Sequence, residues 1–409
     1  MNLTDLLGLI AGGENSRVEF KRDDIPPERL ASRLAGLLNL DGGHVLLGIE
    51  DDRSISGLSR AAVKAEEWVM QVASDHLQPS IIPTWEVVES ENGVAVGIVT
   101  VPANAPDKPY KAKQGSHWVT KVRVGTTTRD ATREEEQRLY QQSGGLRYGL
   151  KPVLGTDLDS LDYRRVRDYF ARVLADVTVP EPGSEQWSLL LRNLEFVTEV
   201  SGHVYATVDG MLLFGRNNRR FVPQCGVRAV CYVGVEPDYA TRADEDIKGA
   251  LVPLGSMDGP LVETGLIERT IDFVRRNTEP TAHLERGRRI DRDAYPADVV
   301  RELVVNALVH RDYSIIGTDV MLSIFSDRLE IQSPGKLPNS ISVDRLLAGS
   351  RYARNQTLMN VMRDYGYVDG RGMGIRLRVL PRMRAHNGSE PEFVEEQHRF
   401  TVRLRQQAP

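Results

Sequence analysis

A short segment in the last third of the chain places polar residues in a pattern that could do chemistry. In RELVVNALVHRDY (residues 301–313), Glu302, Asn306 and His310 recur at every fourth position. If the segment is a helix, these three side chains stack in one stripe, while nearly all the other positions are aliphatic. A carboxylate, an amide and an imidazole are costly to bury unless something pairs with them. We therefore expect the stripe to face either a ligand or internal hydrogen-bonding groups.

Three carboxylates near the start of the chain form a second candidate site. Glu14 and Glu19 flank a strand-like segment, and Asp51 follows the apolar run HVLLGIE. Oxygen ligands from several carboxylates are what Mg²⁺ or Mn²⁺ needs to activate water for phosphodiester cleavage. The alternative is that the two glutamates pair with nearby cations and hold the start of the chain in place. The available cations are Lys21, Arg22 and Arg29.

Basic residues between positions 108 and 123 form a third candidate site, for nucleic acid. Tyr110 and Trp118 interleave with them, as a stacking platform for single strands requires. On a strand, Lys121 and Arg123 would point to the same face. The alternative is a solvated edge strand that lysines protect from pairing. The candidate nucleic-acid-binding residues are Lys21, Lys108, Lys111, Lys113, Lys121 and Arg123.

Composition limits the class of protein. The chain has 409 residues, of which 41% are hydrophobic and 27% charged, so we expect a soluble protein of two or three domains. A formal net charge of −5 excludes a polybasic protein, so nucleic-acid binding needs a local patch. Cys225 and Cys231 suit neither a disulfide framework nor a metal site. Without a signal-peptide pattern or a long apolar run, we expect a cytoplasmic protein with no membrane partner.

The elements that must position these residues follow from periodicity and turn signals. The pattern predicts a helix from Pro26–Pro27 to about Asn39 and a buried strand after the glycines of GGHVLLGIEDD. It also predicts strands near 81–88, 94–101 and 117–125 and helices near 60–77 and after 132, where Thr132 and Glu135 form a capping box. TDVMLSIFSDRLEIQSPG predicts a β-hairpin. The fold class is α/β (α+β), in three domains covering 1–145, 146–288 and 289–409.

Several motifs in the first third of the chain resemble the Schlafen-type AlbA domain. They are GENSRVEFKRDD (13–24), LNLDGGHVLLGIEDDRSISGL (38–58) and KVRVGTTTRDAT (121–132). The resemblance implies a nucleic-acid-binding module. In the Schlafen proteins a Glu, Glu and Asp set cleaves RNA with a divalent metal, which would correspond here to Glu14, Glu19 and Asp51.

Motifs in the last third resemble the C-terminal region of RecG-type proteins, a divergent form of the GHKL ATP-binding fold. They are YPADVVRELVVNALVHRDY, DRLEIQSPGKLP and GRGMGIRL. The resemblance implies that Asn306 helps to hold Mg²⁺ against the phosphates of ATP and that Glu302 activates water, with His310 beside them. The glycines of GRGMG, which are Gly370, Gly372 and Gly374, suit a close approach to phosphate.

The chain departs from the GHKL pattern at the residue that would select adenine. Ser333 stands where the fold's acidic, adenine-recognising residue is expected. The alternative is a degenerate scaffold in which the stripe is satisfied by Arg311, Tyr313 or the backbone. The chain also has no G-x-x-x-x-G-K-[ST] loop, so nothing supports a helicase motor.

The resulting interpretation is a cytoplasmic protein that binds single-stranded DNA or RNA and carries a divergent ATP-binding domain. Such a chain would act as a transcriptional regulator or as a homo-oligomer that coats nucleic acid. Two alternatives stay open. One is a metal-dependent ribonuclease that uses the N-terminal carboxylates, and the other is a structural assembly protein whose sites are degenerate. Whether the protein is an enzyme is left open by the sequence.

Overall fold

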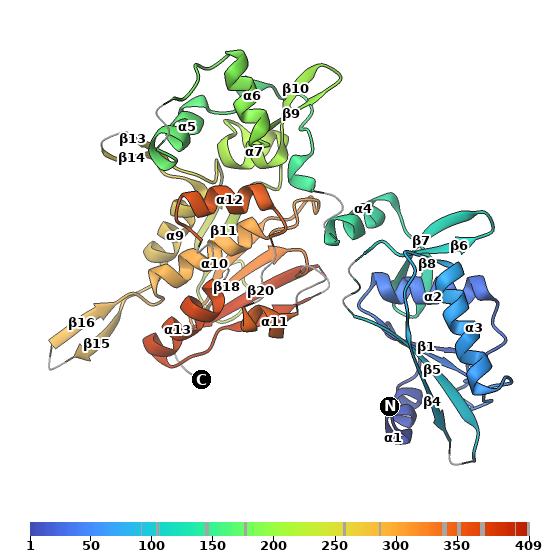
Figure 1. Ribbon diagram of the computed structural model, residues 1–409. Coiled ribbons are helices and arrows are strands. Elements are labelled where there is room, and N and C mark those ends of the chain that lie inside the picture. Colours follow the sequence, from blue (N-terminus) through green and yellow to red (C-terminus); the bar gives the residue numbers. More distant parts are fainter. Residues whose placement is uncertain are drawn as a thin grey trace. The chain divides into compact units, whose positions relative to one another are not determined.

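The chain folds into two compact units, shown in Figure 1. The computed structural model describes residues 1–90, 92–103, 105, 107–143, 147–175, 178–256, 259–285, 288–337, 342–349, 353–368, 373–396 and 398–406. The first unit ends at residue 146 and the second begins at residue 147. Both mix helices with strands from several sheets, which confirms the predicted α+β class.

The first unit contains two four-stranded sheets, with strand orders β1-β2-β5-β4 and β3-β6-β7-β8. Its helices are α1 (Leu3–Gly12), α2 (Pro27–Asn39), α3 (Ala62–Asp75) and α4 (Arg133–Gln142). Its strands are β1 (Val18–Lys21), β2 (Gly43–Leu47), β3 (Leu77–Gln78), β4 (Thr84–Glu89), β5 (Ala95–Val101), β6 (Lys111–Gln114), β7 (His117–Val124) and β8 (Thr127–Asp130). Strands β1 and β2 are parallel, and the other pairs are antiparallel.

Helix α2 connects the two sheets of this unit. It contacts β2 of the first sheet and β6 and β7 of the second. Leu30, Leu34 and Leu38 on this helix are fully buried and share a core with Val45 of β2. Pro27 begins the helix, because its fixed φ suits the first turn and its missing N–H has no partner there anyway.

The second unit is larger. Its helices are α5 (Tyr163–Asp168), α6 (Glu185–Asn193), α7 (Val208–Phe214), α8 (Asn218–Phe221), α9 (Leu266–Asn277), α10 (Ala297–Val309), α11 (Val343–Ala348), α12 (Gln356–Asp364) and α13 (Leu380–Asn387). Short 3₁₀ turns cover Tyr148–Leu150 and Leu158–Ser160, and π-helical turns cover Tyr169–Val173 and Ile375–Val379. Its strands are β9 (Val197–Val200), β10 (His203–Ala206), β11 (Val227–Tyr232), β12 (Thr241–Ile247), β13 (Leu254–Ser256), β14 (Gly259–Glu263), β15 (Thr281–Glu285), β16 (Arg288–Arg292), β17 (Val320–Ile324), β18 (Arg328–Pro334), β19 (Glu392–Glu395) and β20 (Arg399–Arg405).

A six-stranded sheet organises this unit, in the order β12-β11-β17-β18-β20-β19. Strands β11 and β17 run parallel, and β17 and β18 form the predicted hairpin. Helix α9 contacts β11 and β12, and α10 contacts β18, so both lie over the sheet, as Figure 1 shows.

The middle and C-terminal regions, expected as separate domains divided at residue 288, share this sheet and one hydrophobic core. Strands β11 and β12 come from the middle region, yet β11 supplies the hydrogen-bonding partner of β17. The core runs from Val153 to Leu404. A pairing between segments about 90 residues apart leaves no local pattern in the sequence, which is why periodicity alone divided the unit.

None of the helices in the described ranges combines the length and the apolar character needed to cross a membrane.

Candidate functional site

The predicted polar stripe lies on helix α10 (Ala297–Val309), whose other side chains are mostly buried. Glu302 is only 3% exposed. Its Oε1 accepts a hydrogen bond from Asn306 Nδ2 at 3.3 Å, and its Oε2 accepts one from Arg378 Nη1 at 2.9 Å. Burial raises the pKa of Glu302, and the Arg378 cation opposes this rise. A buried carboxylate that is held on both oxygens is fixed in orientation and is a stronger base than an exposed one.

Gly374 lies directly against this carboxylate. A Cβ built on Gly374 would be 1.8 Å from Oε1 of Glu302, so only glycine fits. Gly374 begins the helical stretch that contains Arg378 and α13, and the first turns of this stretch contact α10. The other two glycines of the GRGMG motif, Gly370 and Gly372, lie outside the described residues.

His310 is the C-cap residue of α10, at the end of the stripe. Its backbone carbonyl accepts a hydrogen bond from Arg354 Nη1 at 2.9 Å. Burial, with a smaller contribution from the Arg354 cation, lowers the pKa of His310 to about 4. The imidazole is therefore neutral at physiological pH.

The internal partner of the stripe is not one that the sequence suggested. Arg311 is fully buried and donates hydrogen bonds to the backbone carbonyls of Asp312, Ile315 and Thr318. The Tyr313 hydroxyl donates to the backbone of Leu308. These two residues fix the loop after α10, and Arg378 pairs with Glu302 instead. The alternative in which Arg311 or Tyr313 pairs with the stripe does not match the structure, because both side chains donate to backbone carbonyls.

Ser333, the residue that departs from the nucleotide-binding pattern, has a structural contact. It is buried on β18, and its Oγ donates a 2.7 Å hydrogen bond to the backbone carbonyl of Ala307. The serine thus ties the sheet to α10.

Glu19, one of the three predicted metal ligands, is surrounded by cations instead. The side chain is 1% exposed. Its carboxylate pairs with Lys21 Nζ at 3.1 Å and with Arg33 Nε at 3.0 Å, and Arg123 Nη1 donates to its second oxygen. Glu14 also pairs with Lys21, at 3.2 Å, and accepts from the backbone N–H of Phe20. The alternative in which these glutamates hold the start of the chain in place matches these contacts.

Asp51 is exposed in the turn after β2. Within the described ranges, no three or more His, Cys, Asp or Glu side chains come together as a group that could hold a metal ion. Glu14, Glu19 and Asp51 therefore do not form the shared cation site that the ribonuclease alternative requires.

The predicted basic patch is largely internal, which corrects its interpretation as a surface. Lys108, Lys121 and Arg123 are all buried. Lys108 Nζ donates to the backbone carbonyls of Asn39 and Leu40 and so caps the C-terminal end of α2. Lys121 pairs with Asp130, and Arg123 pairs with Glu19. Buried cations need such partners, because desolvation is costly.

The remaining three lysines are all half-buried and differ in their ion pairs. Lys21 is half-buried between Glu14 and Glu19, and Lys111 pairs with Glu136 of α4 at 2.9 Å. Lys113 is half-buried and has no ion-pair partner within the part of the chain that the structure describes.

Of the two aromatic residues, only one could stack with a base. Tyr110 is buried, whereas Trp118 is 39% exposed. Lys113 on β6 and Trp118 on β7 are directly opposite in register, so their side chains lie on the same face.

Asn39, a residue of the AlbA-like motif, proves to be structural. Its side-chain amide donates to the backbone carbonyls of Tyr110 and Lys121, and its Oδ1 accepts from the Tyr110 N–H, all at 2.7–2.8 Å. It therefore ties the end of α2 to β7 and to the residue just before β6. The sequence offered no signal for this role beyond the motif itself.

The comparisons with known proteins agree with these two resemblances. Residues 14–132 match the family described as "Schlafen, AlbA_2". Residues 317–404 match the family described as "Putative ATP-dependent DNA helicase recG C-terminal". The second match contains Ser333 and Gly374 but begins after α10, so Glu302 and Asn306 lie outside it. Both resemblances that the sequence motifs indicated are confirmed.

Two solved structures resemble the chain, one over nearly its whole length and one over its first third. The DIP2311 protein from Corynebacterium diphtheriae is 19% identical, with a TM-score of 0.45, and the likeness covers 99% of this chain and 80% of that one. The N-terminal domain of a protein from Nitrosomonas europaea, described as a "Putative ATP-dependent DNA Helicase RecG-related Protein", is 22% identical, with a TM-score of 0.26. That likeness covers 32% of this chain and 94% of the domain. No curated protein matches the chain.

Proposed function

We propose that this protein binds single-stranded nucleic acid through the hairpin of β6 (Lys111–Gln114) and β7 (His117–Val124). The observation that carries the proposal is the cross-strand pair of Lys113 and Trp118 on one face of this hairpin. An exposed indole offers a stacking surface to any base, and a lysine without an ion-pair partner in the described residues can contact the adjoining phosphate. The resemblance of residues 14–132 to the Schlafen-type AlbA domain supports the same function.

The proposed binding surface is smaller than the basic patch that the sequence predicted. Lys108, Lys121 and Arg123 hold the unit together from inside, so they are not available to phosphates. Lys111 lies two residues before Lys113 on the same strand and therefore on the same face. A phosphate could take Lys111 from its exchangeable, partly exposed pair with Glu136.

The test is the affinity for a labelled oligothymidylate, measured by fluorescence anisotropy at several salt concentrations. Trp118→Ala should weaken binding by roughly 5- to 150-fold, the effect of removing about 1–3 kcal/mol of base stacking. Lys113→Gln should weaken it less and reduce the salt slope by about 0.7, the value for one phosphate contact on a single strand. The matched control is Lys64→Gln, which changes an exposed lysine on α3. Equal affinities for all three variants and the wild type would contradict the proposal.

We propose further that α10 binds Mg²⁺–ATP in the second unit. One observation favours this: Asn306 Nδ2 donates to Glu302, which leaves Oδ1 of Asn306 without a partner among the described residues. The amide is thereby oriented with its oxygen available, as a metal ligand requires, and amide and carboxylate oxygens suit Mg²⁺. Asn306 would hold the cation, Glu302 would orient the attacking water, and the glycines of the GRGMG motif with His310 would contact the phosphates.

A calorimetric titration tests this second function. Asn306→Ala should abolish binding of Mg²⁺–ATP, whereas Glu302→Gln should preserve binding and remove any hydrolysis. Because Ser333 replaces the acidic residue that would select adenine, GTP should compete with ATP to within about tenfold. If no nucleotide binds at millimolar concentration, the scaffold alternative is correct for this unit.

We propose that the chain also self-associates. A chain with one nucleic-acid surface would gain affinity by self-association, because linked sites bind with increased avidity. A homo-oligomer that coats single strands, or a cytoplasmic transcriptional regulator, would use the hairpin in this way. Sedimentation of the chain with and without oligothymidylate tests the self-association.

A further inference from the structure

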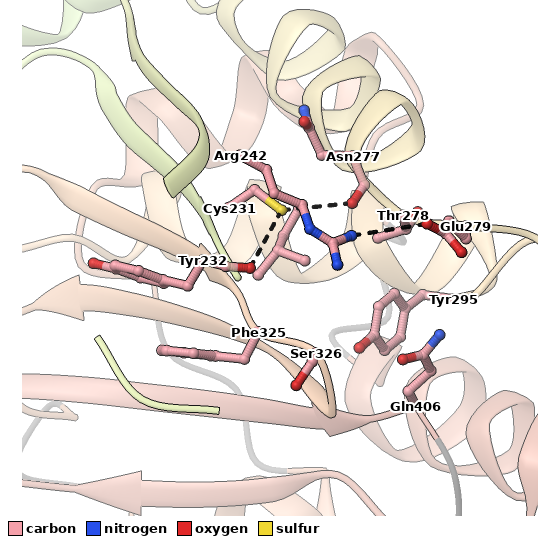
Figure 2. A pocket seen from close by; sticks show the side chains of 11 residues that line it. Cys231, Tyr232, Arg242, Asn277, Thr278, Glu279, Tyr295, Phe325, Ser326 and Gln406 are labelled. Carbon is pink, nitrogen blue, oxygen red and sulfur yellow. Dashed lines mark hydrogen bonds and ion pairs between the residues drawn. The ribbon is translucent and has the colours of Figure 1, made fainter. Parts of the chain in front are cut away.

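A small cavity opens in the second unit, at the ends of two strands of the six-stranded sheet. Its volume is about 130 Å³, and Figure 2 shows the side chains around it. It lies where the parallel strands β11 and β17 both end, next to the end of α9. The carboxyl ends of parallel strands are a common place for ligands, because the chain diverges there and leaves a crevice. The lining residues are Cys231, Tyr232, Arg242, Asn277, Thr278, Glu279, Tyr295, Ile324, Phe325, Ser326 and Gln406.

A β-bulge brings Arg242 to this cavity. Cys231 pairs with Ala243 and Tyr232 pairs with Thr241, so Arg242 is the extra, unpaired residue of β12. Bulges of this kind redirect a side chain and often occur beside binding sites. The only ion-pair partner of Arg242 in the described residues is Glu279, at 3.8 Å, and this glutamate is 91% exposed. Such a long, solvated pair is weak and can exchange for another anion.

Tyr295 supplies a second donor. Its side chain is 4% exposed, yet its hydroxyl has no hydrogen-bond partner among the residues that the structure describes. The hydroxyl oxygen keeps some contact with solvent at the cavity that Tyr295 lines, so it can donate a hydrogen bond to a ligand there. Burial raises the pKa of Tyr295, which keeps the hydroxyl protonated and able to donate.

Gln406 completes the polar wall, and Figure 2 shows its side chain next to Tyr295. Its backbone N–H donates to Asp327, while its side-chain amide has no partner among the described residues. The side chains of the opposite wall already have partners within the protein. The rings of Tyr232 and Phe325 stack at 5.0 Å, and the Cys231 thiol donates to the backbone carbonyl of Asn277 at 3.7 Å.

We propose that this cavity binds a small oxyanion. The three groups that lack a firm partner are a guanidinium, a phenol and an amide, and all three can donate hydrogen bonds to one acceptor group. The volume is close to that of an engineered cavity of about 150 Å³ that holds one benzene molecule, which limits the ligand to about six non-hydrogen atoms. Inorganic phosphate and short carboxylates have this size and this chemistry.

The site is independent of the functions proposed above. Its lining residues include neither the β6–β7 hairpin nor Glu302, Asn306 and Gly374. Failure of nucleotide or nucleic-acid binding would therefore leave this proposal standing, and the reverse also holds.

Titration calorimetry of the full chain with phosphate and, separately, with acetate tests the proposal. One of the two should bind with a stoichiometry of one per chain, and the stronger one identifies the oxyanion class. Arg242→Gln should weaken that binding by about tenfold or more, because a charge-assisted contact is lost. Tyr295→Phe should weaken it several-fold, since this change removes only the hydroxyl.

The matched control is Arg228→Gln, which removes an exposed arginine of the neighbouring strand β11 that pairs with Asp244. This variant should bind like the wild type. Thermal melting without ligand shows whether each variant is folded. The proposal is overturned if neither anion binds at concentrations up to roughly 20 times a dissociation constant of a few millimolar. It is also overturned if the Arg242 and Arg228 variants lose binding equally.

Discussion

The backbone of Gly374 lies against the carboxylate of Glu302, so closely that a Cβ on the glycine would be 1.8 Å from Oε1. The two residues are 72 positions apart in the sequence. The same carboxylate accepts hydrogen bonds from Asn306 and Arg378. Glu302 is thus fixed from three directions, by its own helix, by a cation and by a glycine backbone.

Gly374→Ala should destabilise the second unit. The new methyl group would displace the Glu302 carboxylate, which cannot move without breaking its hydrogen bonds to Asn306 and Arg378. Overpacking of this kind costs about 1–3 kcal/mol of unfolding free energy. Urea unfolding followed by the fluorescence of Trp187, the tryptophan buried in this unit, measures the change.

Gly234→Ala is the control for this substitution. Nothing lies within 4 Å of a Cβ at Gly234, so the variant should unfold like the wild type. An alanine at 374 that is no more destabilising than the one at 234 would contradict the close packing on Glu302.

Glu19→Ala should destabilise the first unit strongly. The change leaves Arg123 buried without its carboxylate, and breaking a buried ion pair from one side costs about 3–5 kcal/mol. Asp24→Ala is the control, because Asp24 and Arg22 form an exposed pair of little energetic value. Hydrogen exchange of β7 reports the stability of this unit separately. A Glu19→Ala protein that is as stable as the control would contradict a structural role for this buried ion pair.

Asp209→Asn should change how stability depends on pH. The Asp209 side chain is 1% exposed, and its Oδ1 has no hydrogen-bond partner in the described part of the chain. Burial raises the pKa of Asp209 to about 7. The folded state therefore binds a proton that the unfolded state releases near pH 4. This contribution to stability is complete below about pH 4 and is lost as the pH rises through 7.

The measurement is the unfolding free energy of wild type and Asp209→Asn at pH 5 and at pH 8. The asparagine stays neutral, so the variant should gain stability relative to the wild type on going from pH 5 to pH 8, by about 1.4 kcal/mol for each pH unit between pH 5 and the folded pKa of about 7. His310, whose pKa is lowered to about 4, makes stability fall as the pH drops below 6.5, but it is present in both proteins and cancels in the comparison. Identical pH dependence in the two proteins would contradict a buried, protonated Asp209.

Patterns that are local in the sequence predicted the elements well. The Thr132–Glu135 capping box, the β17–β18 hairpin and the helix that carries Glu302 are all present as predicted. In each case the signal is a residue type at a spacing of two, three or four positions, which backbone geometry alone converts into structure.

Contacts between distant segments could not be predicted in this way. Strand alternation places Lys121 and Arg123 on one face, but it does not show that this face is buried, so the two cations were interpreted as a surface. The pair of Glu302 and Arg378 spans 76 residues, and nothing near either residue signals the other. The exposed Trp118 and its neighbour Lys113 were found from residue type alone, and the structure added their register.

The measurement that tests the central claim most directly is the quenching of Trp118 fluorescence by single-stranded DNA. Stacking of a base on the indole should quench its emission, and of the four tryptophans in the chain, Trp118 is the one on the β6–β7 hairpin. We predict that oligothymidylate quenches the wild-type protein and that Trp118→Phe removes the quenching while the remaining emission stays constant. Equal quenching in the wild type and in Trp118→Phe, or quenching in neither, would contradict nucleic-acid binding at this hairpin.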